Sequence, residues 1–302
     1  MVAVEHVPRG AVSVGIAAAR VYPRSEWARI WRRLRQHRPA LAGAALIGLL
    51  VLLGLFPDMV APYSAYDINS SLRGNAPSTV HPFGMDQVGR DVLSRVIHGA
   101  RIAMLVGFSA TGLSLVVGVS VGATAGYFGG AVDAILMRVV DALQAFPILV
   151  LLIAIAAALG PSLTNVIVII GLTTWAQYAR VVRADVLSLR EREFVFAART
   201  IGVPSRRIIV RHILPNVMGP IIVLASLSVA GVILLESALS FLGLGTQPPT
   251  PSWGSMLSDG RAYILTYPHI ALFPGLAITV TVLAFNLLGD GLRDALDPRT
   301  IG

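Results

Sequence analysis

The chain has 302 residues, of which 55% are hydrophobic and only 13% are charged. Its mean hydropathy of +0.74 agrees with these fractions, and together they exclude an ordinary soluble domain. The absence of cysteine excludes a disulfide framework and a thiolate metal cluster. We therefore expect an integral membrane protein.

The charged residues exclude two further classes. The 24 basic residues are all arginine, and a chain without lysine cannot form a Walker A motif. The net charge of +8 would suit a nucleic-acid binder, but the arginines lie between apolar runs, where membrane topology explains them. We expect no nucleic acid among the partners.

Uncharged stretches indicate how often the chain crosses a membrane, because a helix needs about 20 apolar residues to span the hydrocarbon core. The stretches without Asp, Glu and Arg are 39–57, 102–132, 142–179, 212–235 and 262–289. The stretch 142–179 is too long for one crossing, and Gly160-Pro161-Ser162 interrupts it where helical hydrogen bonding would fail. These patterns predict an all-α integral membrane protein with six transmembrane helices.

The distribution of arginine predicts the orientation. With a cytoplasmic N-terminus, 19 arginines lie on the cytoplasmic side and 5 outside, in agreement with the positive-inside rule. A signal peptide is an alternative for the first apolar stretch, but that stretch exceeds the usual h-region of about 7–15 residues, which favours an uncleaved anchor. We expect a multi-pass protein of the inner or plasma membrane with both termini in the cytoplasm.

The expected crossings divide the chain into segments. These are a cytoplasmic segment 1–38, a first transmembrane helix 39–62, an extracytoplasmic loop 63–100, a core of five helices at 101–291 and a cytoplasmic tail 292–302. Within the core, 186–215 forms a cytoplasmic loop and the proline-rich 244–268 an extracytoplasmic loop. In the first extracytoplasmic loop Asp91 can cap a short helix, which either lies at the membrane interface or packs against other helices.

Gly118, Gly122 and Gly126 repeat every four residues in the second predicted helix and share one face. Such a face lets another backbone approach closely, so we expect helix packing rather than a role in substrate binding. Whether the partner helix belongs to this chain or to another subunit stays open.

A few charges lie near the ends of predicted helices. Arg138 and Asp141, three residues apart near the cytoplasmic end of the third helix, can pair on one face, and Asp133 lies close by. Charges near a membrane end are tolerated at low cost, so a structural role is favoured over transport, and Glu236 near the outer end of the fifth helix is interpreted in the same way.

The cytoplasmic segment Glu191–Asn216 reads EREFVFAARTIGVPSRRIIVRHILPN, which is polar enough to leave the membrane and still patterned for helices. It predicts two short helices around a turn, because Gly202 accepts a positive φ and Pro204 cannot continue a helix. The small residues Ala197 and Ala198 in the first helix would let it sit in a groove of another protein.

This segment resembles the EAA loop of importer-type ABC permeases, in which an acidic residue and two alanines precede a glycine and a Leu-Pro pair at fixed spacing. The matching residues are Ala197, Ala198, Gly202, Leu214 and Pro215. The chain departs from the pattern at Phe196, which stands in the acidic position, and at His212, which stands in place of isoleucine. Glu191 and Glu193 lie just upstream of that position.

Three further stretches are similar to the DppC- or OppC-like subunit of the dipeptide, oligopeptide and nickel permease family. They are HPFGMDQVGRDVLSRVIHGAR from His81, ESALSFLGLGTQPPTPSWG from Glu236 and FNLLGDGLRDALDPR from Phe285. Together with the loop they cover most of residues 80–299.

The resemblance implies a type I ABC importer permease fold that forms half of a translocation pathway for dipeptides or oligopeptides. Nickel chelates, glutathione or another small solute are the alternative cargoes. It also implies a non-catalytic subunit that binds no cofactor itself, with ATP and magnesium held by ATPase partners. The other implied partners are a homologous DppB- or OppB-like permease, two ATP-binding subunits or one fused ATPase, an extracytoplasmic substrate-binding protein and the lipid bilayer.

The resemblance also assigns a role to the cytoplasmic loop. In such importers its helix docks on a cytoplasmic ATPase, and a rigid lever must connect that contact to the membrane. The fourth predicted helix can provide the lever, because it can continue towards the loop beyond Tyr178 without glycine or proline. The residues assigned to coupling are Glu193, Phe194, Phe196, Ala197, Ala198, Gly202, Pro204, Leu214 and Pro215.

Two other classes fit the sequence less well. A self-sufficient secondary transporter binds ions through buried acids near the midplane, whereas the central parts of the six predicted helices carry no acid. An intramembrane protease needs paired aspartates or a Ser-His couple within the bilayer. Asp290 has no obvious partner there, and His212 and His269 fall at helix ends.

Overall fold

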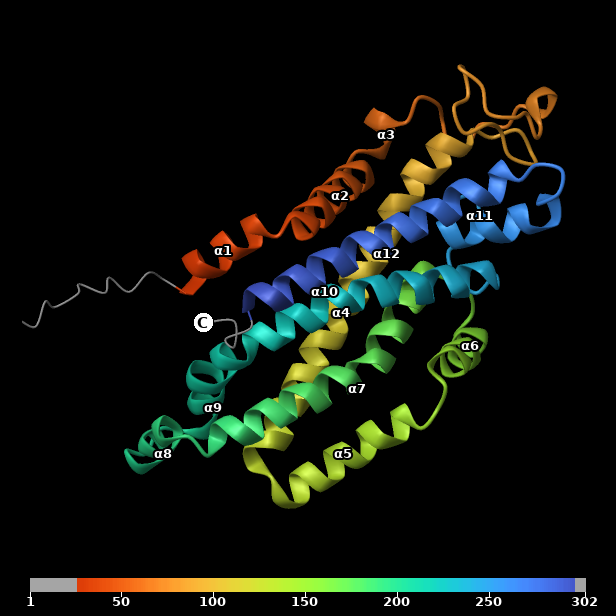
Figure 1. Ribbon diagram of the computed structural model, residues 1–302. Helices are drawn as coiled ribbons and strands as arrows, with labels where there is room; N and C mark the ends of the chain where they lie inside the picture. Colours follow the sequence, from red (N-terminus) through yellow and green to blue (C-terminus); the bar gives the residue numbers. More distant parts are fainter. Residues whose placement is uncertain (1–25, 297–302) are drawn as a thin grey trace, which may run out of the picture.

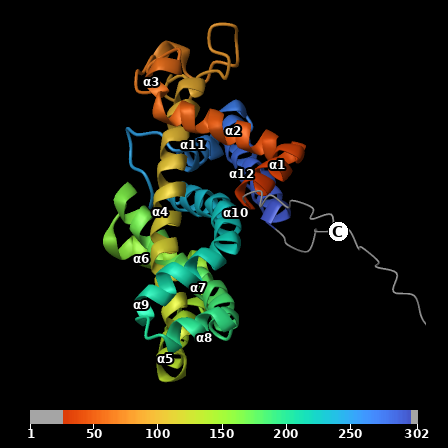
Figure 2. The ribbon, with the colours of Figure 1, turned by 90° about the vertical axis from the view of Figure 1, so that its left-hand side faces the viewer.

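The computed structural model describes residues 26–296 and shows long helices running side by side (Figures 1 and 2). In chain order the helices are α1 (Glu26–Gln36), α2 (Arg38–Leu55), α3 (Pro57–Val60), α4 (Val92–Phe128), α5 (Gly130–Gln144), α6 (Ile148–Leu159), α7 (Leu163–Arg190), α8 (Glu193–Thr200), α9 (Ser205–Ile208), α10 (Leu214–Phe241), α11 (Trp253–Gly260) and α12 (His269–Leu296). Short turns of other helical types lie at Ser70–Leu72, Ile209–Ile213 and Arg261–Tyr263. Within the described range the only β pairing is an isolated bridge between Met85 and Asp91, so the all-α prediction is confirmed.

In the described part of the chain, five helices are long and apolar enough to cross a membrane: α2, α4, α7, the continuous helix Ser205–Phe241 and α12. The one remaining expected crossing corresponds to α5 and α6. The chain bends by 86° between these two helices. The 12 residues of α6 are too few for a crossing, because they extend only about 18 Å against a hydrocarbon core of about 30 Å. A sixth crossing exists only when the bent pair is counted as one.

The bend between α5 and α6 lies within the uncharged stretch 142–179, in which the sequence pattern predicts no break before residue 160. Pro147 stands directly before α6, and a proline disfavours the helical conformation for the residue that precedes it, here Phe146. The expected break at Gly160-Pro161-Ser162 is present: Gly160 follows the last residue of α6, and the Ser162 hydroxyl accepts a hydrogen bond from the backbone N–H of Asn165 at 3.0 Å.

The helix capped by Asp91 is not a separate interfacial element. Asp91 accepts the backbone N–H of Ser94 at 2.8 Å, and the helix continues as α4 for 37 residues, about 55 Å. Gly99 lies inside this helix. Trp253 packs directly over Gly99 and donates its indole N–H to the Val96 carbonyl at 2.9 Å. Of the two alternatives for these turns, packing against other helices is the observed one.

The other segment boundaries also shift. The first crossing is shorter than 39–62, because α2 ends at Leu55 and the short α3 follows. The extracytoplasmic segment 244–268 contains α11, which begins where the Ser252 hydroxyl accepts the Ser255 backbone N–H at 3.3 Å. Most of the predicted segment 1–38 lies outside the described residues, and the tail 292–302 is described only to Leu296.

Buried ion pairs hold the first extracytoplasmic loop against the bundle. The Asp86 carboxylate accepts the Arg90 Nε–H at 2.6 Å and lies 3.6 Å from the Arg95 guanidinium. Both arginines also face Asp259 of α11, at 3.7 and 3.8 Å. Because Arg95 is buried between these acids, the loop, α4 and α11 form one cap at this end of the bundle, which the sequence predicts to be extracytoplasmic.

The glycine face of α4 packs against α7 of the same chain, which answers the question that the sequence left open. A Cβ atom on Gly118 would lie 2.5 Å from the Cβ of Tyr178, and one on Gly126 would lie 2.9 Å from the Arg183 carbonyl oxygen. A Cβ on Gly122 would meet the carbonyl oxygen of Ala179. Real Cβ atoms do not approach backbone so closely, so the two helices can lie at this distance only because these positions carry no side chain.

We predict that Gly122→Ala lowers the stability of the permease by about 1–3 kcal/mol, because the added methyl group forces α4 away from the α7 backbone. The thermal unfolding midpoint of the purified protein measures the effect. Gly112→Ala in the same helix is the matched control, since a Cβ there has no atom within 4 Å, and it should be neutral or slightly stabilising. Equal losses in both variants would contradict the packing role.

Candidate functional site

The cytoplasmic loop follows directly from α7, which runs without interruption from Leu163 to Arg190. Its buried residues Ala179, Val182 and Val186 face α4, while arginines occupy its cytoplasmic part. The continuous hydrogen bonding of α7 makes it a stiff connection between the middle of the bundle and the loop.

Two ion pairs brace α7 against α5. Arg183 forms a two-point contact with Asp133, through its Nε and through an Nη2 that lies 2.6 Å from the second carboxylate oxygen. Arg180 donates to Asp141 at 2.7 Å. The predicted pair of Arg138 with Asp141 is therefore wrong, because α7 brings Arg180 to that carboxylate instead. The Arg180 pair is largely exposed and adds little stability, whereas the two-point contact also orients the helices.

The turn after α8 has the hydrogen bonds of a Schellman motif. Gly202 has a φ of +79° and donates its backbone N–H to the Arg199 carbonyl at 3.0 Å, and Val203 donates to the Ala198 carbonyl at 3.0 Å. Pro204 then starts α9, where its carbonyl accepts the Arg207 N–H at 2.8 Å. The turn therefore needs glycine for its backbone conformation and not for space, since a Cβ on Gly202 would meet no atom within 4 Å.

The two alanines of the EAA-like motif differ in exposure, although they are neighbours in α8. Ala198 is buried together with Val195, and both join a core cluster with Ile208 and Ile213. Ala197 is exposed, and next to it Phe196 is 71% and Ile201 79% exposed. One face of α8 thus attaches the loop to the bundle, while the other presents apolar side chains to solvent.

Phe194 and Glu193 lie at the start of α8 and are also exposed. Ile201 was not among the expected coupling residues, although it is the most exposed apolar residue of the loop. The sequence carried no signal for it, because exposure here depends on which face of α8 the bundle covers.

The second predicted helix of the loop is not a separate element. α9 passes through the π-helical turn Ile209–Ile213 into α10, and the whole segment Ser205–Phe241 forms one helix. Pro215 cannot donate a backbone hydrogen bond to the preceding turn, which accounts for the irregular hydrogen bonding at this place. Leu214 and Pro215 therefore lie at the junction of loop and membrane helix, and not on the exposed face of α8.

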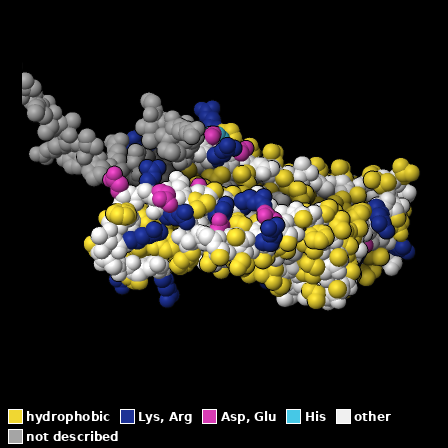
Figure 3. Space-filling model, turned by 90° about the horizontal axis from the view of Figure 1, so that it is seen from below, with side chains coloured by type: hydrophobic (Ala, Val, Ile, Leu, Met, Phe, Trp, Pro, Cys, Tyr) yellow, Lys and Arg dark blue, Asp and Glu magenta, His cyan; other side chains and the backbone are white. Residues whose placement is uncertain are grey.

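Two further contacts tie the loop to the cytoplasmic end of α4. The Arg190 guanidinium donates to the Gly126 carbonyl at 3.1 Å, and the Arg199 guanidinium stacks over the Tyr127 ring at 4.7 Å. Charged side chains gather over the half of the molecule that carries α8, while the other half of the same face is largely hydrophobic (Figure 3). This division agrees with a cytoplasmic position for the loop.

The described residues form a bundle of helices long and apolar enough to cross a membrane, with an exposed apolar helix at one end, as expected for a membrane permease subunit. Comparison with protein families supports this class. Residues 118–302 match the family described as the binding-protein-dependent transport system inner membrane component. Residues 25–77 match the N-terminal TM domain of oligopeptide transport permease C. The chain belongs to this inner-membrane permease family and is of the OppC and DppC type.

Curated relatives cover nearly the whole chain. It is 44% identical over 275 residues to the dipeptide transport system permease protein DppC of Alkalihalophilus pseudofirmus, covering 91% of this chain and 90% of the relative. It is 43% identical over 282 residues to the glutathione transport system permease protein GsiD of Escherichia coli, covering 92% of each chain.

A solved structure supports the fold. A chain of the inward-facing MetNI methionine ABC transporter matches with a TM-score of 0.55 at 15% identity, over 68% of this chain and 97% of that chain. The protein is therefore a non-catalytic, multi-pass inner-membrane permease subunit of an ABC importer, which confirms the expected fold, class and localisation. Membership in a binding-protein-dependent family brings an ATPase and a binding protein as partners, and it rules out the secondary transporter and protease alternatives.

We predict that Gly202→Val disturbs the turn after α8, because a β-branched residue at φ +79° costs about 1–2 kcal/mol or more. Amide hydrogen exchange of α8 in the assembled importer should then be about tenfold faster. Gly202→Asn is the matched control and should change exchange far less, since asparagine tolerates this conformation. Unchanged protection in the valine variant would show that the turn does not depend on glycine.

Proposed function

We propose that the chain forms half of the translocation pathway of an importer for small peptides, and that α8 is the element through which ATP hydrolysis acts on it. The observation that carries the coupling role is the exposed apolar face of α8 at the end of the braced helix α7. The names of two relatives support the choice of cargo.

The cargo proposal rests on what two relatives are named for. One is a dipeptide permease protein and the other a glutathione permease protein, and glutathione is itself a tripeptide. A small peptide is the chemical feature that these two cargoes share. Nickel chelates or another small solute are the alternatives within the same importer class.

The docking role rests on the geometry of α8. Phe196 and Ile201 are large apolar side chains that the chain itself does not cover, and Phe194 is 43% exposed beside them. Exposed apolar side chains of this size mark a contact with a protein partner, and aromatic anchors often dominate the binding free energy of such contacts. Phe196, in the position of the acid in the EAA pattern, would contact the ATPase by burial instead of by a salt bridge.

The arginines around α8 suit an acidic rim on that partner. Arg206, Arg207 and Arg211 line a shallow groove with Pro204 and Val210 on the neighbouring turn. Charges at the rim of an interface mainly guide association and orientation, while the apolar centre provides most of the affinity.

The proposed assembly contains four kinds of component. A second, homologous permease of the DppB or OppB type completes the pathway, and two ATP-binding subunits or one fused ATPase bind the cytoplasmic face. An extracytoplasmic binding protein delivers the solute. ATP and magnesium belong to the ATPase, and this chain binds neither.

We predict that Ala197→Trp lowers ATP-driven dipeptide uptake by about tenfold or more, because the indole cannot enter the space that an alanine occupies at the docking face. The full importer is reconstituted in vesicles with its binding protein, and uptake and co-purification of the ATPase are measured together. Ala197→Ser is the matched control, and its small side chain should preserve both.

Since Ala197 is exposed, the tryptophan variant should fold and assemble with the second permease. Normal uptake and normal ATPase association in this variant would sink the docking proposal. Uptake by the wild-type chain alone, without ATPase or ATP, would also contradict it.

A further inference from the structure

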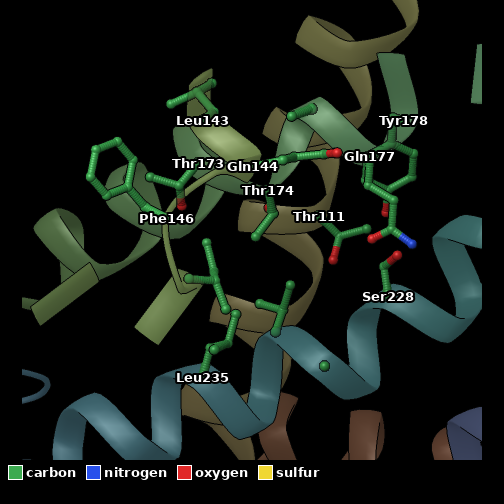
Figure 4. A pocket seen from close by; sticks show the side chains of 14 residues that line it. Thr111, Leu143, Gln144, Phe146, Thr173, Thr174, Gln177, Tyr178, Ser228 and Leu235 are labelled. Atoms are coloured by element: carbon green, nitrogen blue, oxygen red, sulfur yellow. The ribbon is translucent and has the colours of Figure 1, made fainter. Parts of the chain in front are cut away.

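A cavity of about 460 Å³ lies between α4, α5, α7 and α10, beneath the bend that joins α5 to α6 (Figure 4). Its volume falls within the range of about 300–1,000 Å³ typical of small-molecule sites. Its lining contains no charged side chain, although it carries seven polar ones. A solute group held here would therefore be uncharged and able to form hydrogen bonds.

Two hydroxyl groups in this cavity have no hydrogen-bond partner within the described chain. They are Thr111 Oγ1 of α4 and the Tyr178 hydroxyl of α7, and their residues are only 5% and 2% exposed. Ser228 of α10 lies next to the Tyr178 hydroxyl but not in hydrogen-bond geometry. Buried hydroxyls are normally paired, and an unpaired one is a specific feature to explain. Both can donate and accept, so they suit a ligand that offers both functions.

The other hydroxyls of the lining are already paired with their own helices. Thr173 Oγ1 donates to the Ile169 carbonyl at 2.7 Å, and Ser228 Oγ donates to the Leu224 carbonyl at 2.7 Å. The unpaired state of Thr111 and Tyr178 therefore does not reflect a general lack of acceptors in these helices.

Two carboxamides add to the hydrogen-bonding capacity. Gln144 of α5 and Gln177 of α7 line the cavity as exposed residues, and neither side chain forms a hydrogen bond within the part of the chain that the structure describes, so both are free to bond a solute. Each offers an N–H donor and a carbonyl acceptor. This combination is complementary to a peptide group, which itself has one donor and one acceptor.

The two ends of the cavity differ in polarity, although Thr173 also lies on the side of Phe146 (Figure 4). Figure 4 shows Thr111, Tyr178 and Ser228 gathered at one end, with Leu143 and Phe146 on the opposite side. An amide with an apolar side chain could place the amide at the polar end and the side chain against the leucine and phenylalanine.

We propose that this cavity is a solute-binding site that holds an uncharged amide group of the transported molecule through Thr111 and Tyr178. The proposal rests on the proposed function as a small-peptide permease and adds the part of the peptide that is recognised: its backbone amide and not its charged ends. The proposed site is connected to the cytoplasmic loop by α7. Tyr178 lies about 18 Å along this helix from Arg190, after which the loop begins.

The first test measures binding without ATP and without the binding protein. The intact importer is incubated with the uncharged probe acetyl-alanyl-alanine amide, and its thermal unfolding midpoint is recorded. The probe should raise the midpoint of the wild type by about 2 °C or more when its concentration is well above its Kd. The shift should disappear in the double variant Thr111→Val with Tyr178→Phe, which removes both hydroxyls and keeps the shapes of the side chains.

Thr281→Val on α12 is the matched control. Thr281 is fully buried, and its hydroxyl donates to the Ala277 carbonyl at 2.7 Å outside the cavity, so this variant should keep the probe-induced shift. Because neither hydroxyl forms a hydrogen bond of normal geometry within the described chain, the double variant without probe should be close to the wild type in stability. An absent shift in the wild type, or an equal shift in the double variant, would overturn the proposal.

The second test measures dipeptide uptake with the same binding protein in every sample. Each single variant should raise KM by about 3- to 10-fold, the effect of one neutral hydrogen bond. If the wild type imports dipeptides and the double variant has an unchanged KM, the cavity proposal is wrong while the proposed function stands. If the wild type imports no dipeptide and the probe shift behaves as expected, the cavity proposal stands and the choice of cargo is wrong.

Discussion

Helices in a lipid bilayer gain no hydrophobic free energy by leaving the acyl chains for each other, so their association depends on close packing. In this permease the contact of α4 with α7 meets that requirement. Gly118, Gly122 and Gly126 leave room for the backbone of α7, and Ala179 and Val182 are completely buried against them. Because dispersion contacts fall off steeply with distance, even a small separation of the two helices would weaken the whole interface.

Other parts of the molecule depend on the position of α7. Its middle carries Tyr178 and Gln177, which line the cavity between α4, α5, α7 and α10. Its cytoplasmic part carries Arg180 and Arg183, which pair with aspartates of α5. Its end leads directly into α8. A single stiff helix therefore connects the interior of the bundle to the loop, and a displacement at either end must be transmitted or absorbed at the turns that border it.

α4 extends this organisation to the other side of the membrane. Its outer turns form the cap with the extracytoplasmic loop through Arg95 and with α11 through Trp253, while its inner end contacts the cytoplasmic loop through Tyr127. The same helix thus contacts both extramembrane parts, and the glycine face fixes α7 between them.

The sequence by itself determined the features that depend on local composition and order. Hydropathy was sufficient for the membrane class and the approximate crossings, and Gly202 with Pro204 was sufficient for the turn after α8. The orientation inferred from the arginine distribution stays a prediction. The motifs around residues 81, 197, 236 and 285 were sufficient for the family. The break at Pro147 was missed because a proline inside an apolar run signals a bend only when the run is known to be helical on both sides.

Only the tertiary structure decided which residues meet. It assigned α7 as the partner of the glycine face, paired Asp141 with Arg180 instead of Arg138, and placed Ala198 inside and Ala197 outside. It also brought Thr111, Gln144, Tyr178 and Ser228 from four helices to one cavity. Periodicity shows which residues share a face of one helix, but the helix that covers that face is set by packing between segments far apart in the chain.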